Sequence, residues 1–245
     1  MNARVRLDIL LTERGFAPTR ERAKALILSG SVLVEEKMVD KAGALVAQGA
    51  TIRLTGDDNP YVSRGGLKLK GALDHFGIKV SHFVALDVGA STGGFTDCLL
   101  QEGAAKVYAL DVGYGQLAWR LREDKRVMPI ERTNIRFFEG AGLVEDVDIA
   151  TIDTSFISLK LVIPAVLKLL AGNASLLALI KPQFEVGKKE VGKGGVVRDP
   201  ALHRQVIEGI TQFSRESGLD VMGVCESPIT GPAGNKEFFI FARKS

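Results

Sequence analysis

Residues 83–97 combine an apolar run, FVALDV, with the glycine-rich stretch GASTGG and a following segment that favours a helix. An apolar run of this length that ends in glycines predicts a buried strand followed by a tight turn. Further apolar runs occur at 107–111, 148–153 and 175–181, with helix-forming segments between them. Strands that alternate with helices predict a parallel sheet covered by helices on both faces.

The rest of this part of the chain completes an α/β fold with a Rossmann-like sheet. The sheet is expected to be mostly parallel, with an antiparallel last strand. The further helices are expected at 115–123, 158–170 and 200–217, and the further strands at 127–131, 220–226 and 237–242.

The first 55 residues predict a separate, smaller α+β domain. Thr19 is a suitable N-cap for a helix, and Gly30 is suited to end that helix. The expected elements are helices from Leu7 and at 20–29, a hairpin at 32–39 and a strand at 50–54. The polar stretch GDDNP indicates a linker. The expected boundaries are 1–55 for the first domain, 56–62 for the linker and 63–245 for the second domain.

The beginning of the chain carries an excess of positive charge. Residues 1–30 contain six lysines and arginines but only three acids, and Arg20 and Lys24 lie one turn apart on one predicted helix face. Such a face is suited to contact a phosphate backbone. An ordinary solvated helix carries the same pattern, and charge alone does not separate the two interpretations.

Composition excludes several other classes of protein. Cys98 and Cys225 are too far apart in sequence for a disulfide framework, which favours a reduced, cytoplasmic setting. The three histidines show no metal-ligand spacing, so no metal site is predicted.

Residues 161–180 are long enough to span a membrane, but Lys168 near their middle would cost about 2.5–3.5 kcal/mol there. A helix, a turn at Gly172-Asn173 and a buried strand explain this run better. The N-terminus lacks the apolar stretch of a signal peptide.

The glycine turn predicts a nucleoside-binding site. It would match a dinucleotide fingerprint as Gly89-x-Ser91-x-x-Gly94, but Ser91 replaces the glycine that lets a pyrophosphate approach closely. This argues against NAD and favours S-adenosylmethionine, whose ribose an acid such as Asp111 would bind. A purely structural turn is the alternative. The candidate cofactor residues are Gly89, Ala90, Ser91, Thr92, Gly93, Gly94, Phe95, Thr96, Asp111, Val112 and Asp153.

Four charged residues are expected to converge at one edge of the sheet. Asp153 and Lys181 close apolar strands, and Glu237 opens the last strand. Lys68 precedes the first strand of the sheet and could reach the same edge from a helix. Charges that end buried strands are poorly explained as solvated surface. A lysine held by a carboxylate could orient or deprotonate a weakly acidic hydroxyl. Structural salt bridges are the alternative.

Seven segments of the sequence together resemble one known family. The chain is similar, over essentially its whole length, to the TlyA (haemolysin A) family of RNA 2′-O-methyltransferases. The second domain resembles an FtsJ-type methyltransferase of class I, and the first resembles the RNA-binding module named after ribosomal small-subunit protein four. The segments are YVSRGGLKL, LDVGASTGGFTD, DVGYGQLAWRLR, ERTNIR, DTSFISL, KPQFEVG and GPAGNKEFF.

The resemblance implies S-adenosylmethionine as methyl donor and the ribose 2′-hydroxyl of a cytidine in ribosomal RNA as acceptor, with ribosomal subunits as partners. It implies no metal and no membrane, and it requires no oligomer. The chain ends just after the last expected strand, as in the shorter members, which are associated with large-subunit RNA. The family's catalytic tetrad falls on Lys68, Asp153, Lys181 and Glu237, and its RNA contacts fall on Arg6, Arg20, Lys41, Arg64, Arg132 and Arg136. One departure is the hairpin turn Glu35-Glu36-Lys37, where such modules usually carry Asn-Gly.

The expected reaction is a single displacement in which the 2′-oxygen attacks the sulfonium methyl. Lys181 would deprotonate or orient the hydroxyl and Asp153 would hold that lysine, while Lys68 and Glu237 complete the site. Phe95, Trp119 and Phe156 could flank the adenine or a flipped base, although such residues more often belong to a core.

One segment and two other functions remain open. The loop at 183–200, with Lys188, Lys189 and Lys193, is interpreted as a mobile flap that faces RNA, or as a plain flexible loop. A membrane-acting haemolysin would need an amphipathic or spanning segment, and none is convincing. A non-catalytic ribosome assembly factor would need the basic first domain but not the four charged residues.

Overall fold

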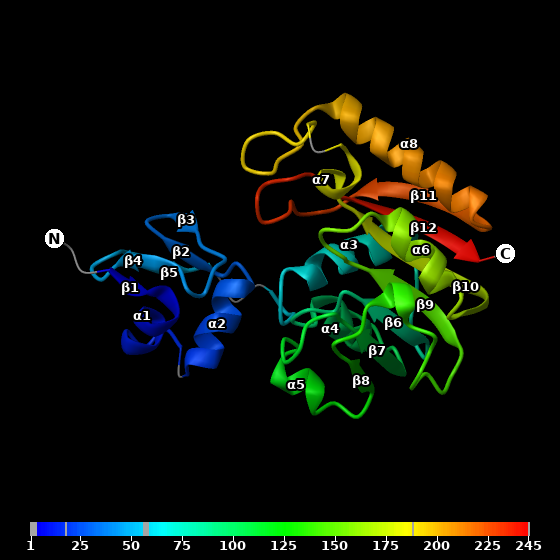
Figure 1. Ribbon diagram of the computed structural model, residues 1–245. Coiled ribbons are helices and arrows are strands. Elements are labelled where there is room, and N and C mark those ends of the chain that lie inside the picture. The colour runs from blue at the N-terminus through cyan, green and yellow to red at the C-terminus, as the bar shows by residue number, and fades with distance from the viewer. Residues whose placement is uncertain (1–3, 18, 56–58, 188, 245) are drawn as a thin grey trace. The chain divides into compact units, whose positions relative to one another are not determined.

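The computed structural model describes residues 4–17, 19–55, 59–187 and 189–244. Packing divides the chain into two compact units, one reaching to Arg64 and the other beginning at Gly65 (Figure 1). Residues 56–58 of the predicted 56–62 linker lie outside the described residues, as does Lys188 of the predicted flap.

In its described residues, the N-terminal unit contains two helices and five short strands. Strands β1 and β4 form one antiparallel pair, and β3, β2 and β5 form a three-stranded sheet in that order. The predicted helices, hairpin and final strand are confirmed, whereas β1 and β4 were not predicted. The elements are β1 (Arg4–Arg6), α1 (Leu7–Glu13), α2 (Arg20–Leu28), β2 (Val32–Val34), β3 (Lys37–Met38), β4 (Leu45–Ala47) and β5 (Ile52–Leu54).

Local chemistry explains two features of this unit. The Thr19 hydroxyl accepts a hydrogen bond from the Arg22 amide, so Thr19 caps α2 as predicted. Glu35 and Glu36 both have positive φ (51° and 58°), the conformation for which Asn-Gly is usually selected. The two glutamates are held by other contacts instead. The Glu35 carboxylate accepts from the Thr51 amide at 2.7 Å, and Glu36 pairs with Arg53 at 2.6 Å.

The C-terminal unit is built on a seven-stranded sheet with the order β11-β12-β10-β9-β6-β7-β8. The sheet is parallel except for β12, which runs antiparallel to both β10 and β11, as predicted. The strands are β6 (Val84–Val88), β7 (Lys106–Leu110), β8 (Val127–Ile130), β9 (Val147–Ile152), β10 (Leu170–Ile180), β11 (Leu219–Glu226) and β12 (Phe238–Lys244). The helices are α3 (Gly65–Phe76), α4 (Gly94–Gln101), α5 (Trp119–Arg122), η1 (Ile135–Phe137), α6 (Leu159–Leu167), α7 (Pro182–Glu185) and α8 (Pro200–Glu216).

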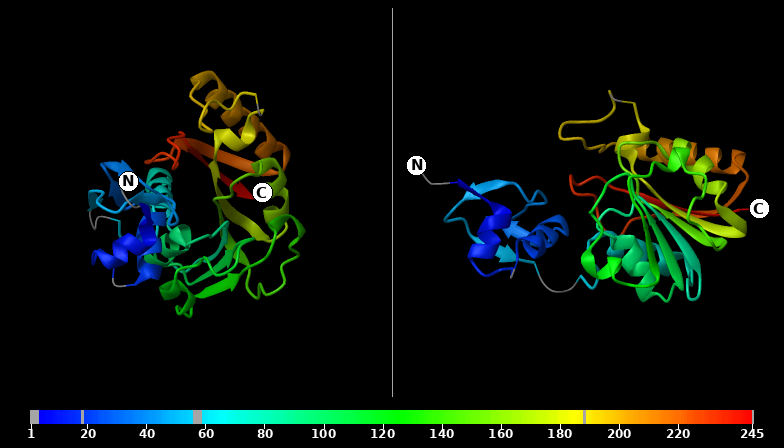
Figure 2. Two further views of the ribbon diagram at one scale, coloured as in Figure 1. Left: turned by 60° about the vertical axis from the view of Figure 1, so that its left-hand side comes forward. Right: turned by 60° about the horizontal axis from the view of Figure 1, so that its bottom comes forward.

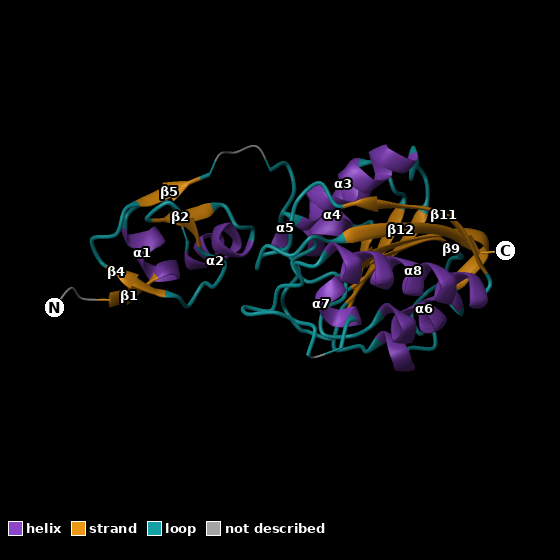
Figure 3. Ribbon diagram, turned by 90° about the horizontal axis from the view of Figure 1, so that it is seen from above, coloured by secondary structure: helices purple, strands orange, loops and turns teal. Residues whose placement is uncertain are grey.

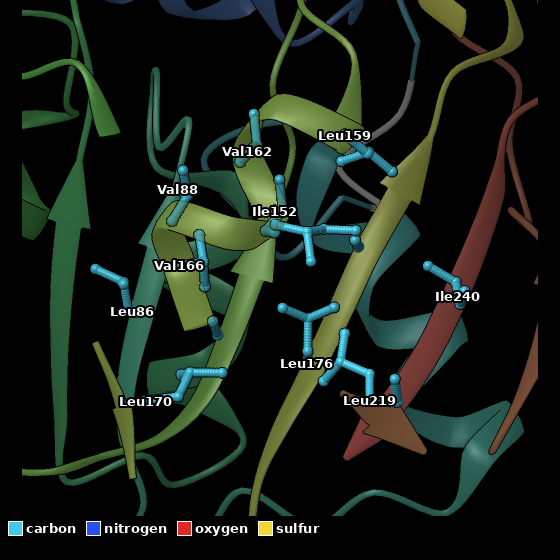
Figure 4. Close-up of a cluster of buried hydrophobic side chains, with 14 of the residues drawn as sticks. Leu86, Val88, Ile152, Leu159, Val162, Val166, Leu170, Leu176, Leu219 and Ile240 are labelled. Carbon is cyan, nitrogen blue, oxygen red and sulfur yellow. The ribbon is translucent and has the colours of Figure 1, made fainter. Parts of the chain in front are cut away.

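Helices cover both faces of this sheet. Helices α3 and α4 pack together on one face, and α6 and α8 pack together on the other (Figure 3). Both views in Figure 2 show α8 running along β11, which it contacts. On the α6 face, Leu86 and Ile152 of the strands lie in one buried cluster with Val162 and Val166 of α6 (Figure 4). The apolar strands that the sequence predicts as buried therefore form the core.

Two predicted elements need correction. The helix expected at 115–123 is shortened to Trp119–Arg122. The turn expected at Gly172-Asn173 lies inside β10, which begins at Leu170. The register between β9 and β10 shifts between Leu170 and Ser175, and Asn173 takes a φ of 64°. The two residues thus form an irregularity within one strand, because Leu170 pairs with Val147 before the regular ladder begins.

The apolar run at 161–180 is divided between α6 and β10. Among the described residues, no helix is both long and apolar enough to cross a membrane.

Candidate active site

The glycine turn follows β6 and ends at the start of α4. Gly89 and Gly93 have φ values of 88° and 95°, which favour glycine. A Cβ on Gly89 would lie 2.5 Å from the backbone oxygen of Asp153, at the end of the neighbouring strand β9. A Cβ on Gly93 would collide with Leu117 and Leu121. The two glycines are therefore required by close packing of the chain on both sides of the turn.

Most amides of this turn donate to the chain itself. The Gly89 and Ala90 amides donate to the Leu110 carbonyl, at 2.8 and 3.1 Å, and the Gly93 amide donates to the Ala90 carbonyl at 2.7 Å. The Ser91 amide donates to Asp111 Oδ2 at 2.8 Å. These four amides are already bonded within the chain, so they are not free donors for a ligand.

Asp111 follows β7 and joins the turn to the neighbouring loop. Its other oxygen, Oδ1, accepts from the Gly113 amide at 2.6 Å. A carboxylate offers about four acceptor positions, so Asp111 retains acceptor capacity for a ribose hydroxyl. The next residue, Val112, is 69% exposed. An acid with spare acceptors beside an exposed apolar side chain fits the ribose and adenine of a nucleoside.

Two of the candidate cofactor residues have side chains committed to the core. The Phe95 side chain is buried and stacks on Phe239, with ring centroids 6.0 Å apart. Thr96 is fully buried, and its hydroxyl donates to Asp87 at 2.7 Å.

Asp87 was not singled out from the sequence, although a carboxylate inside the run VALDV is an unusual signal. It is fully buried, and it also accepts from the Thr151 hydroxyl at 3.3 Å. Burial is the main reason that the pKa of Asp87 rises from 3.8 to about 7; the hydrogen bond from Thr96 opposes this rise, and the charge of Asp153 adds to it. Asp87 thereby connects β6, α4 and β9 beneath the glycine turn.

The raised pKa of Asp87 predicts a pH-dependent stability. A folded-state pKa above the unfolded value contributes stability that is complete below about pH 4 and is lost as the pH rises through about 7. Each unit of pKa is worth about 1.4 kcal/mol. Relative to Asp87→Asn, the wild-type free energy of unfolding should therefore fall by up to a few kcal/mol between about pH 4 and pH 8. Urea denaturation at several pH values measures this difference, and a difference independent of pH would contradict the assignment.

The four charged residues form two ion pairs. Lys181 Nζ, just after β10, lies 2.6 Å from Asp153 Oδ1, just after β9, and donates to the Ser155 hydroxyl at 2.9 Å. Lys68 Nζ, in α3, donates to Glu237 Oε2 at 2.5 Å. Both lysines and Glu237 are buried. Strands β9 and β10 are parallel neighbours, so their carboxyl ends place Asp153 and Lys181 at the same edge.

Gln183 contacts the Lys68–Glu237 pair and was not predicted from the sequence. It lies two residues after Lys181, and its Nε2 is 3.5 Å from Glu237 Oε1. Among the described residues, the buried Gln183 Oε1 and Thr154 Oγ1 have no hydrogen-bond partner. A buried oxygen without a partner costs about 1–3 kcal/mol, so such atoms mark places where a ligand can supply the missing donor. No group of three or more His, Cys, Asp or Glu side chains in the described part of the chain is placed to hold a metal ion.

The candidate RNA contacts of the N-terminal unit include two arginines fixed by one acid. Arg6 Nε and Arg20 Nε donate to the two oxygens of Asp8, at 3.0 and 2.8 Å. Asp8 is fully buried, and the hydrogen bond from Arg6 is the main reason that its pKa falls to about 2. The two guanidiniums stay partly exposed, and Lys41 is exposed. Arg64 lies against Met38 and Gly30 of the same unit.

In the C-terminal unit, both candidate arginines lie against exposed aromatic rings. The Arg132 guanidinium is 4.1 Å from the centre of the Tyr114 ring, and that of Arg136 is 5.3 Å from the Phe137 ring. Tyr114 and Phe137 are 67% and 74% exposed. Arginines combined with exposed rings suit phosphates and unstacked bases of single-stranded RNA.

The strand order with one antiparallel strand, the glycine turn after β6 and the acid after β7 define a class I methyltransferase. The model of the FtsJ-like methyltransferase family matches residues 61–244, and that of the S4 domain matches residues 5–52. The chain therefore belongs to the FtsJ-like methyltransferase family and, as its motifs and its relatives show, to the TlyA (haemolysin A) family within it.

Two relatives and one solved structure resemble nearly the whole chain. The "Putative rRNA methyltransferase YqxC" of Bacillus subtilis is 48% identical, with 96% of this chain and 84% of the relative covered. The "16S/23S rRNA (cytidine-2'-O)-methyltransferase TlyA" of Mycobacterium tuberculosis is 44% identical, with 99% and 91% covered. The solved "Putative hemolysin from Streptococcus thermophilus" is 42% identical, with a TM-score of 0.78 and 100% and 90% covered.

Proposed function

We propose that this chain transfers a methyl group from S-adenosylmethionine to the ribose 2′-hydroxyl of a cytidine in ribosomal RNA. One observation carries the proposal: Asp153 takes part in both halves of the site. Its backbone oxygen lies against Gly89 of the cofactor turn, and its carboxylate holds Lys181. A lysine amine is thereby placed beside the turn that would bind the methyl donor. The substrate follows the printed activity of the mycobacterial relative.

The residues around the turn fit S-adenosylmethionine. Asp111 would accept from the ribose hydroxyls, Val112 would cover the adenine, and Ser91 would border the amino-acid part. The bound cofactor supplies an electrophilic methyl carbon. Lys181 orients the 2′-hydroxyl, and its ammonium passes a proton to the Asp153 carboxylate as the amine takes up the hydroxyl proton. Asp153 and Ser155 also fix the position of the Lys181 amine. The pair of Lys68 and Glu237, with Gln183, would hold the ribose beside it.

Phe156 would stack on the target base. It is 89% exposed, lies three residues after Asp153 and contacts the Phe184 ring at 5.0 Å. Its φ of 64° lies in the left-handed region, which is uncommon for an aromatic residue.

Removing the Phe156 ring should weaken substrate binding. Stacking of a base on an aromatic ring is worth about 1–3 kcal/mol, so Phe156→Ala should raise KM for RNA by roughly 5-fold to 150-fold. Phe156→Trp should keep the KM for RNA close to that of the wild type. Steady-state methylation measures both variants, and an unchanged KM for Phe156→Ala would remove Phe156 from the substrate site.

Transfer of a radiolabelled methyl group to unmodified ribosomal RNA tests the proposed function. The assay compares three substrates: separate small subunits, separate large subunits and intact ribosomes. Primer extension then locates the modified ribose. Labelling of a cytidine 2′-oxygen supports the proposal. RNA binding without label in any arm would favour a non-catalytic assembly factor, and leakage of liposomes without label would favour a haemolysin.

A further inference from the structure

The loop between α7 and α8 is not a free flap. A bridge between Gly192 and Val196 closes a tight turn, in which the Gly192 amide donates to the Val196 carbonyl at 3.1 Å. Lys193 is at the tip and is followed by two glycines, Gly194 and Gly195, with φ values of 79° and 77°. The turn thus has a defined, hydrogen-bonded shape.

Asn235 fastens this turn to another part of the chain. Its Oδ1 accepts from the Val197 amide at 3.0 Å, and its Nδ2 donates to the Gly195 carbonyl at 2.9 Å. The Asn235 side chain therefore pairs with the loop backbone as a neighbouring strand would. Asn235 is 2% exposed, and the Val197 side chain is also buried. The Val197 carbonyl is bonded in turn to the His203 ring in α8, at 2.9 Å.

The same segment carries a member of the candidate active site. Glu237 is two residues after Asn235, and the Asn235 carbonyl accepts from the Gly231 amide at 2.9 Å. A Cβ on Gly231 would lie 2.5 Å from Glu237 Oε1, so this turn packs directly against the Glu237 carboxylate. The position of the 192–197 turn is thereby tied to that of the Lys68–Glu237 pair.

The loop carries exposed cationic side chains that form no ion pair with a described acid. Lys189, Lys193 and Arg198 are exposed, and none of them forms an ion pair within the described ranges. The one acid between them, Glu190, uses its carboxylate on the Gly187 amide at 2.8 Å. A rigid turn with unpaired cations beside a nucleotide site is suited to a phosphate backbone.

We infer that residues 189–198 form a preformed contact for RNA phosphates next to the target nucleotide, and that Asn235 is the positioning residue that sets this contact relative to Glu237. The inference rests on the proposed function for the identity of the nucleic acid.

Salt-dependent binding to ribosomal subunits separates this inference from a purely structural loop. Each phosphate contact contributes about 0.7–0.9 to the slope of log affinity against log salt concentration. Lys193→Ala should remove about one such contact, which lowers the magnitude of this slope by about 0.7–0.9 and raises the Kd for ribosomal subunits about fivefold. Lys79→Ala removes another exposed lysine, just before the amino end of β6, and should leave both quantities unchanged. If Lys193→Ala leaves both the slope and the Kd unchanged, as Lys79→Ala should, the inference is wrong.

Asn235→Asp tests the positioning role with an isosteric side chain. The aspartate keeps the acceptor for the Val197 amide but places an oxygen against the Gly195 carbonyl, which should release the turn. We expect faster tryptic cleavage at Lys189 and Lys193 and a rise in KM for RNA that exceeds any fall in kcat. Adding Lys193→Ala to Asn235→Asp should cause little further loss of affinity, because a released turn no longer delivers Lys193. Additive losses would show that Asn235 does not position Lys193.

The outcomes also separate this inference from the proposed function. If the wild type methylates RNA and Lys193→Ala binds RNA as the wild type does, only the loop contact is refuted. RNA binding that depends on Lys193, without methyl transfer, refutes the proposed reaction alone.

Discussion

Replacing Lys181 by methionine should reduce methyl transfer by about 10²–10⁴-fold or more while changing the affinity for S-adenosylmethionine by less than about twofold. Proton transfer and orientation by a positioned side chain contribute factors of this size. The Lys181 amine contacts Asp153 and Ser155, whereas the cofactor turn is held by separate bonds to Leu110 and Asp111. Methionine retains the length and volume of the lysine stem.

Single-turnover methylation and calorimetric titration of the cofactor measure the two effects of Lys181→Met. Lys168→Met is a matched control, because the exposed Lys168 precedes the amino end of β10 whereas Lys181 follows its carboxyl end. The control should methylate at the wild-type rate. A Lys181→Met enzyme within tenfold of the wild-type rate would show that this amine does not act on the hydroxyl.

Gly89→Ala should abolish cofactor binding, with a loss of more than about 100-fold in affinity. The added methyl group would lie 2.5 Å from the Asp153 carbonyl oxygen, and Gly89 has a φ of 88°. Strands β6 and β9 are hydrogen-bonded neighbours in the middle of the sheet, so neither moves away cheaply. Relief of the clash would have to displace the turn or Asp153, and Asp153 is the residue that joins the cofactor turn to Lys181.

Gly218→Ala isolates the backbone strain from the clash. Gly218 has a φ of 85°, and no atom lies within 4 Å of a Cβ built on it. This control should lose about 1–2 kcal/mol of stability and keep full cofactor affinity. Thermal denaturation and calorimetric titration measure both variants. Normal cofactor binding by Gly89→Ala would show that the close approach to Asp153 is not needed.

Residues at the ends of strands were the most predictable part of the site. Asp153, Lys181 and Asp111 each follow an apolar run, and parallel strands bring their carboxyl ends to one edge. Asp87 was missed because its role depends not only on Thr96 but also on Thr151, which is 64 residues away in sequence. The beginning of β10 was missed because local sequence favours a turn at Gly172-Asn173, whereas pairing of Leu170 with Val147 extends the strand.

Contacts made across long sequence separations were not predictable in detail. The anchored loop is one example, since the partners of Asn235 are 38 and 40 residues away. Its Gly-Lys content alone is equally typical of a flexible segment, and only the Asn235 bonds show that it has a fixed shape.

The sequence alone determined the alternating strands and helices, the antiparallel last strand, the glycine turn and the family, because these depend on apolar periodicity and on residues close together in the chain. Only the tertiary structure decided that Lys68 forms an ion pair with Glu237. Lys68 and Glu237 are 169 residues apart, and they meet because α3 packs on one face of the sheet while Glu237 directly precedes the antiparallel strand β12. Such pairings follow from the close packing of the whole domain, which no local stretch of sequence encodes.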